Sequence, residues 1–156
     1  MKVSDIMTKD VLYFYEDESI FDAITQMTEK NISGAPVLNR KGELVGIIST
    51  TDIVEFLNIE LDLKPKNMRS IWSLILYSLK KLAEMEKIKH IKDLMKMTKI
   101  KDLMSKDVYT VSPNTTILEA VDIMDEKDIS RLPVIDNGKL VGIITKGDIV
   151  RYILKL

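Results

Sequence analysis

Two stretches of the chain repeat one another and decide its fold: ISGAPVLNRKGELVGIISTTD at residues 32–52 and ISRLPVIDNGKLVGIITKGD at residues 129–148. The likeness extends to the beginning of each copy, where SDIMTKDV at residues 4–11 aligns with KDLMSKDV at residues 101–108. Residues keep their order over roughly fifty positions, which is more than shared secondary-structure propensity produces. The chain is therefore a duplication.

Each copy shows the same succession of local patterns. Short β-branched or aromatic runs at residues 11–14 and 108–111 predict strands. A helix follows in each copy, beginning at Ser19 or at the capping box that Thr116 forms with Glu119, and its apolar residues lie on one face. Two strands joined by the turn NRKG or NG come next, and a last helix begins near the final aspartate. The order in each copy is strand, helix, strand, strand, helix.

These patterns predict a mixed α/β (α+β) fold with three parts. Residues 1–57 form the first β-α-β-β-α repeat, residues 58–100 an inserted helical linker, and residues 101–156 the second repeat. A unit of about 55 residues buries too little surface to be secure alone. We expect the two repeats to pack around a pseudo-twofold axis, which creates two equivalent clefts at their junction.

The composition excludes many functions. The 156 residues include 23 basic and 24 acidic side chains, so that nucleic-acid binding is not expected. There is no cysteine and only one histidine, His90, which leaves neither a metal site nor the parts of a catalytic triad. The apolar run at residues 71–79 is about half the length of a membrane span. We therefore expect a cytoplasmic protein with no metal and no membrane contact.

The end of each LVGII run is the candidate ligand site. Ser49 and Thr145 precede a helix start, and Asp52 and Asp148 follow three residues later. Free amides at a helix start attract phosphate, the hydroxyl can donate to it, and the carboxylate can accept from ribose hydroxyls. The same spacing also describes a capping box without a ligand. Its occurrence in both copies favours binding, since each aspartate can cap and bind.

With ISxxPV followed in both halves by GxLVGII, a hydroxyl residue and xxD, the chain resembles the CBS (cystathionine β-synthase) domain family, arranged as a tandem pair or Bateman module. The resemblance implies a sensor that binds AMP, ADP, ATP or an S-adenosylmethionine-type ligand between its repeats. It implies no catalysis and no other cofactor, and it makes a homodimer and a regulated partner protein expected. An enzyme is the weaker alternative, because no GxxxxGK[ST] phosphate loop is present.

The resemblance also assigns residues to two clefts. The Asp52 cleft combines Ser49, Thr51 and Asp52 with Tyr109, Ile129, Ser130, Arg131 and Pro133. The Asp148 cleft combines Thr145, Lys146 and Asp148 with Leu12, Ile32, Ser33 and Pro36. Arg131 is matched by Gly34 in the first repeat, so we expect the Asp52 cleft to prefer a charged nucleotide, unless Arg131 is an ordinary surface residue.

Residues 58–100 are longer than the linkers usual in this family and should contain ordered structure. Apolar residues that include Ile75, Leu79 and Leu82 share one face of a helix of about four turns, which bends or ends near Lys89. That face packs either within the molecule or against another chain. In the second case the protein would be an interaction or oligomerisation module rather than a ligand sensor. The motif IKDLM occurs at residues 91–95 and again at 100–104, as an alternative register, a local duplication or a mimic of the repeat start.

Overall fold

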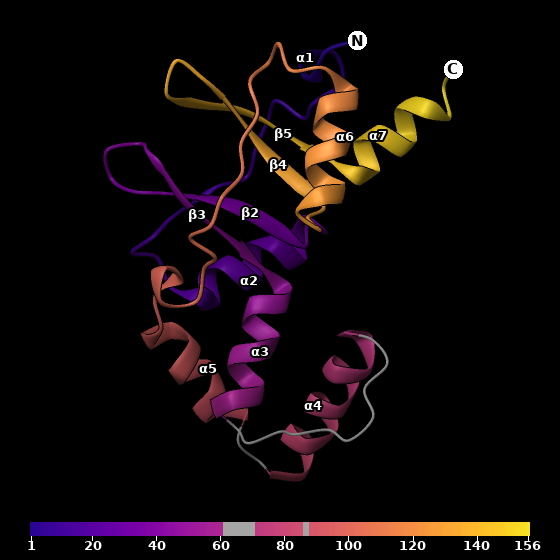
Figure 1. Cartoon of the computed structure of the whole chain (residues 1–156). Coiled ribbons are helices and arrows are strands. Elements are labelled where there is room, and N and C mark those ends of the chain that lie inside the picture. The colour runs from indigo at the N-terminus through magenta and orange to yellow at the C-terminus, as the bar shows by residue number, and fades with distance from the viewer. Residues whose placement is uncertain (61–70, 86–87) are drawn as a thin grey trace.

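The computed structural model describes residues 1–60, 71–85 and 88–156 (Figure 1). Its elements are α1 (Val3–Ile6), β1 (Phe14–Tyr15), α2 (Ile20–Glu29), β2 (Gly34–Leu38), β3 (Leu44–Ser49), α3 (Thr50–Glu60), α4 (Ile71–Met85), α5 (Ile88–Met97), the 3-10 turn η1 (Ile100–Asp102), α6 (Ile117–Glu126), β4 (Arg131–Asp136), β5 (Lys139–Thr145) and α7 (Lys146–Ile153). Within these residues no helix combines the length and the apolar character needed to cross a membrane.

Two small sheets carry the two repeats. One has the strand order β1-β2-β3 and the other pairs β4 with β5, and each contains an antiparallel hairpin. The predicted first strands are much shorter than expected. In the first repeat, pairing starts at Phe14 opposite Val37, and in the second it is reduced to one parallel bridge between Val111 and Val134. The two pairs are equivalent positions of the duplication.

The first residues of each repeat pack on the other repeat, which explains why those strands are short. Thr8 pairs with Ile143 of β5, and Ser105 pairs with Ile47 of β3. Val3 of α1 is fully buried in the core of the second repeat, and Ile100 is fully buried in the core of the first. Figure 1 shows α1 beside β5 and α6. The two repeats therefore exchange their starting segments around the predicted pseudo-twofold axis.

The repeated glycine of GxLVGII is required by this exchange. A Cβ on Gly46 would lie 2.5 Å from Sδ of Met104 and 2.9 Å from the backbone oxygen of Ser105. On Gly142 it would lie 2.6 Å from Sδ of Met7 and 3.0 Å from the backbone oxygen of Thr8. Because glycine has no Cβ, each crossing segment can approach its strand this closely.

The predicted helix starts and turns are confirmed. Ser19 accepts the amide of Asp22, and Thr116 forms the complete capping box of α6. The hairpin residues Asn137 and Gly138 both have positive φ, as a two-residue β-turn of this kind requires. The last helices start earlier than expected, at residues 50 and 146, because Asp52 and Asp148 occupy the third helical position rather than the first.

The inserted segment contains two helices in its described part. Helix α4 ends at Met85 and α5 begins at Ile88, and the residues between them, where the predicted bend or end near Lys89 would begin, lie outside the described part. The first IKDLM copy is helical, with Ile91 and Met95 in the core of the first repeat. Helix α4 contacts α3. On the predicted apolar face Leu79 is 58% exposed, so this part of the face is not packed within the molecule, whereas Ser78 is buried. The prediction for Leu82 concerns a side chain outside the described part.

Candidate functional site

Two cavities lie between the repeats, at the carboxyl ends of β3 and β5. The Ser49 cavity has a volume of about 290 Å³, and the Thr145 cavity has a volume of about 480 Å³. Equivalent residues of the duplication line them: Ile47, Ser49 and Ser105 in one, and Ile143, Thr145 and Thr8 in the other. Each cavity is lined by both repeats, as the pseudo-twofold packing requires.

The start of α7 forms one wall of the Thr145 cavity. Oδ2 of Asp148 accepts hydrogen bonds from the backbone amide of Thr145 at 2.9 Å and from its hydroxyl at 3.0 Å. That hydroxyl in turn accepts the amide of Asp148 at 3.1 Å. The start of α3 repeats the arrangement, with Ser49 amide and hydroxyl at 2.8 and 3.0 Å from Oδ2 of Asp52. The capping interpretation is therefore confirmed at both sites, and in each it occupies one carboxylate oxygen.

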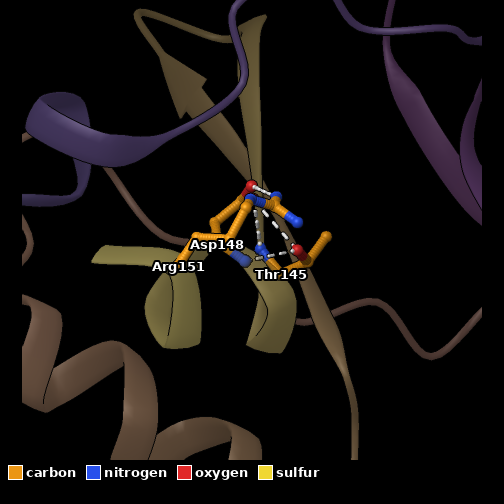
Figure 2. A network of polar contacts seen from close by, with 3 residues as sticks. All are labelled: Thr145, Asp148 and Arg151. Atoms are coloured by element: carbon orange, nitrogen blue, oxygen red, sulfur yellow. Dashed lines mark hydrogen bonds and ion pairs between the residues drawn. The ribbon is translucent and has the colours of Figure 1, made fainter. Parts of the chain in front are cut away.

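The second carboxylate oxygen distinguishes the two sites. Oδ1 of Asp148 forms an ion pair with Nη2 of Arg151, one helical turn later (Figure 2). The absence of a side chain on Gly147 lets the guanidinium fold back, since a Cβ there would lie 3.3 Å from Nη1 of Arg151. In the first repeat the equivalent of Arg151 is Glu55, an acid that cannot form this pair. Asp148 is buried and charge-paired, whereas Asp52 is only half-buried.

Arg131 lies between the two cavities and lines both. Its Nη2 donates to Oγ of Ser33 at 2.8 Å, and the guanidinium fills the space beside Gly34, where a Cβ would lie 1.4 Å from Nη1. Nη1 is buried and has no hydrogen-bond partner among the described residues. Burial lowers the pKa of the Arg131 guanidinium, and the charge of Asp52 opposes that shift. Arg131 thus lines the cleft to which it was assigned, and its side chain also reaches over Gly34 into the other cavity.

The charges of the cavities also differ. Asp107 and Asp128 line the Ser49 cavity and face one guanidinium, that of Arg131. Lys146 and Arg151 join Arg131 in the Thr145 cavity, where Asp148 is already paired. The more cationic cavity is therefore the one at Asp148, opposite to the expectation from Arg131 alone. Both cavities are open to solvent, which screens the exposed members of each set.

Most of the predicted site residues lie where the sequence placed them. The Ser49 cavity is lined by Ser49, Thr51, Tyr109, Ile129, Ser130 and Arg131, and the Thr145 cavity by Thr145, Lys146, Asp148, Ile32 and Ser33. Four predicted residues do not line their cavity. Pro36 and Pro133 are buried within β2 and β4, Leu12 packs against the core of the first repeat, and Asp52 lies behind Ser49.

Several lining residues were not predicted, among them Ser105, Asp107 and Arg151. Ser105 and Asp107 reach the Ser49 cavity because the crossing segment carries them there, an arrangement that spacing within one repeat does not reveal. Arg151 could have been found. Its position, three residues after Asp148 on a helix, is the spacing at which opposite charges meet.

The fold and the cavities define a class of protein: a two-repeat α/β module with paired sites between its repeats. The family model for the CBS domain matches residues 3–59 and 100–155. The chain belongs to the CBS domain family, as a tandem pair of such domains.

Relatives support this assignment over nearly the whole chain. An uncharacterized protein of Methanocaldococcus jannaschii is 38% identical over 99% of this chain and 92% of its own length. The crystal structure of CBSX2 in complex with AMP has a TM-score of 0.70 at 27% identity and covers 99% of this chain and 96% of that one. A CBS domain pair of protein MJ0100 shares the fold, with a TM-score of 0.70 at 23% identity over 99% of this chain and 97% of that one.

Enzymes are also among the relatives, but the shared part is small. The A-adding tRNA nucleotidyltransferase of Aquifex aeolicus is 28% identical over 98% of this chain, which is 14% of the enzyme's length. For the homoserine O-acetyltransferase of Methanohalobium evestigatum the matched share is 24% of the enzyme. These enzymes thus contain a region similar to this chain together with a much longer remainder.

Proposed function

We propose that this protein is a sensor that binds adenosine-containing ligands in the Ser49 and Thr145 cavities and transmits their occupancy to its own assembly or to a partner protein. The ligand class is AMP, ADP, ATP or an S-adenosylmethionine-type molecule. The observation that carries the proposal is the repeated helix start, where a hydroxyl held by the capping aspartate lines a cavity that the other repeat also lines. The relative CBSX2, whose structure contains AMP, supports the choice of adenosine ligands.

The chemistry of each cavity suits such a ligand. Asp148 lines the Thr145 cavity and can accept from ribose hydroxyls with lone pairs that the cap leaves open. Asp52 does not line the Ser49 cavity and acts there by holding Ser49, which does. Ile47 and Ile129, or Ile143 and Ile32, offer apolar contacts for a flat base. The amides of Thr51 and Gly147, at the helix starts, lie where a phosphate would be attracted.

Ligand binding would act on the arrangement of the repeats. Because each cavity is lined by both repeats, a bound ligand shifts their relative placement by as much as its affinities for the two arrangements differ. We expect the protein to act as a cytoplasmic homodimer, in which the exposed side chains of Leu118, Val150 and Ile153 on α6 and α7 would be covered. We propose no catalytic role.

Calorimetric titration with AMP, ATP, S-adenosylmethionine and methylthioadenosine tests the ligand class. We expect saturable binding of at least one of them by the wild-type protein, weakened roughly tenfold or more in Asp52→Ala and Asp148→Ala through loss of a charge-assisted hydrogen bond. Asp22→Ala is the matched control, since Asp22 also follows a capping serine by three residues but lies outside the cavities. Absence of binding across the panel would contradict the proposal.

A second candidate function is protein interaction through α4. The observation that favours it is the exposure of Leu76 and Leu79, at 48% and 58%, on a helix inserted between the repeats. Protein interaction would be favoured over ligand sensing if no ligand of the panel bound and if an acidic substitution on α4 dissociated an assembly.

A further inference from the structure

We infer that Arg131 couples the two cavities, so that a phosphate-bearing ligand in the Thr145 cavity weakens the binding of a second one in the Ser49 cavity. This inference rests on the proposed function and adds a rule for how the two sites communicate. It follows from the position of one guanidinium, from the hydrogen bonds already made by its nitrogens, and from the charges that remain when it is engaged.

The duplication supplies two cavities but one such guanidinium. The equivalent of Arg131 is Gly34, and the Arg131 side chain lies in the space that a side chain at position 34 would need. The residue therefore lies close to the pseudo-twofold axis and lines both cavities. An arginine at each equivalent position would serve the cavities independently, but the geometry leaves room for one.

One nitrogen of the guanidinium, Nη1, can still donate a hydrogen bond. Nη2 is held by Oγ of Ser33, and the edge from Nε to Nη1 packs over Gly34. Nη1 is buried without a partner among the described residues, although a buried donor normally has one. Because Nη1 is packed over Gly34, the guanidinium has to turn before a phosphate oxygen in either cavity can supply the missing acceptor. It can turn toward one phosphate at a time.

The surrounding charges determine in which cavity a bound phosphate contacts Arg131 first. Lys146 and Arg151 attract a phosphate to the Thr145 cavity, so its ligand engages Arg131 most readily. The Ser49 cavity then retains Asp107 and Asp128 without the opposing guanidinium, and these carboxylates repel a second phosphate. An uncharged ligand such as adenosine has no phosphate to contact Arg131, so its binding in one cavity does not weaken binding in the other.

The test compares AMP binding when the Thr145 cavity is open or blocked. Lys146→Glu places a carboxylate in the path of the phosphate at an exposed position, which leaves the fold intact. We expect AMP to bind the Ser49 cavity of this variant roughly tenfold more tightly than the second AMP binds the wild-type chain. In the double variant with Arg131→Gln, this gain should disappear relative to Arg131→Gln alone. Adenosine should show no gain in either background.

Lys139→Glu is the charge-matched control, because Lys139 is exposed at the opposite end of the same strand, β5. A gain that persists with Arg131→Gln would overturn the inference. So would two AMP molecules that bind the wild-type chain independently, or a Lys146→Glu chain that binds no AMP. In the last two cases wild-type binding still supports the proposed function, whereas a wild-type chain that binds no adenosine ligand at all would remove both.

Discussion

At the scale of single residues, the two sites differ more than their motifs suggest. Both aspartates cap a helix, but Asp148 is also paired with Arg151, and the equivalent Glu55 cannot do the same for Asp52. Asp52 therefore keeps an oxygen without an ion pair among the described residues, while Asp148 shares its cavity with Arg131, Lys146 and Arg151. Equivalent residues of a duplication thus acquire different electrostatic properties through a neighbour one turn away.

Gly34→Ala tests the position of Arg131. The added Cβ would collide with Nη1, but the clash involves the far end of a flexible side chain, so the guanidinium can move away. We expect a folded protein whose free energy of unfolding changes little and whose affinity for AMP falls as it does in Arg131→Gln. The measurement is calorimetric titration of both single variants and of the double variant. If the two effects simply add, the substitutions act independently and this position for Arg131 is contradicted.

Gly142→Ala tests the crossing segment. Here the Cβ would meet the backbone oxygen of Thr8 as well as Met7, and the backbone cannot move aside cheaply. We expect a loss of about 2 kcal/mol in the free energy of unfolding, the cost typical of overpacking. Urea denaturation measures it. Gly147→Ala is the control, because a Cβ there would meet only side-chain atoms, the nearest being Nη1 of Arg151 at 3.3 Å. An unchanged stability of Gly142→Ala would contradict the close approach.

At the scale of secondary structure, the sequence predicted the capped helix starts correctly but predicted first strands that are longer than those observed. The capping patterns at Ser19 and Thr116 depend on residues three apart, so local sequence determines them. The runs at 11–14 and 108–111 have strand composition, but how much of each pairs depends on where the crossing segments lead.

The capping box of α6 gives a prediction with a defined pH dependence. The Glu119 carboxylate accepts the amide of Thr116, and this bond lowers the pKa of Glu119 in the folded protein. Its contribution to stability is therefore present above the pKa of the unfolded chain and is lost as the pH falls through the lower folded pKa. Thr116→Ala should reduce the free energy of unfolding by about 1 kcal/mol at neutral pH.

Denaturation curves from pH 7 down to about pH 3 check this prediction, since the carboxylate titrates within that range. Glu119→Gln should flatten the acid side of the stability curve relative to wild type. Glu126→Gln, an exposed change in the last turn of the same helix, should not. Equal curves for Glu119→Gln and wild type would contradict the role of this bond.

Leu79→Asp tests whether α4 presents an interaction surface. Because the side chain is 58% exposed, the free energy of unfolding should change by no more than about 0.5 kcal/mol. Light scattering after gel filtration would show whether the assembly of the protein changes. A large loss of stability would mean that Leu79 is buried in solution, against the arrangement described for α4.

At the scale of the whole molecule, the duplication explains both the fold and the paired cavities. The sequence predicted two repeats, their pseudo-twofold packing and about half of the residues that line the junction. It did not predict the exchange of the starting segments, because contacts such as Thr8 with Ile143 join residues more than a hundred positions apart. The shared position of Arg131 was missed for the same reason: it depends on how the repeats meet.

A crystal structure of the protein grown with saturating AMP tests whether adenosine ligands bind between the repeats. We predict nucleotide in the Thr145 cavity, with the phosphate near Lys146 and Arg131 and the ribose at Asp148. Empty cavities under these conditions, or nucleotide bound only at another surface of the molecule, would contradict the claim.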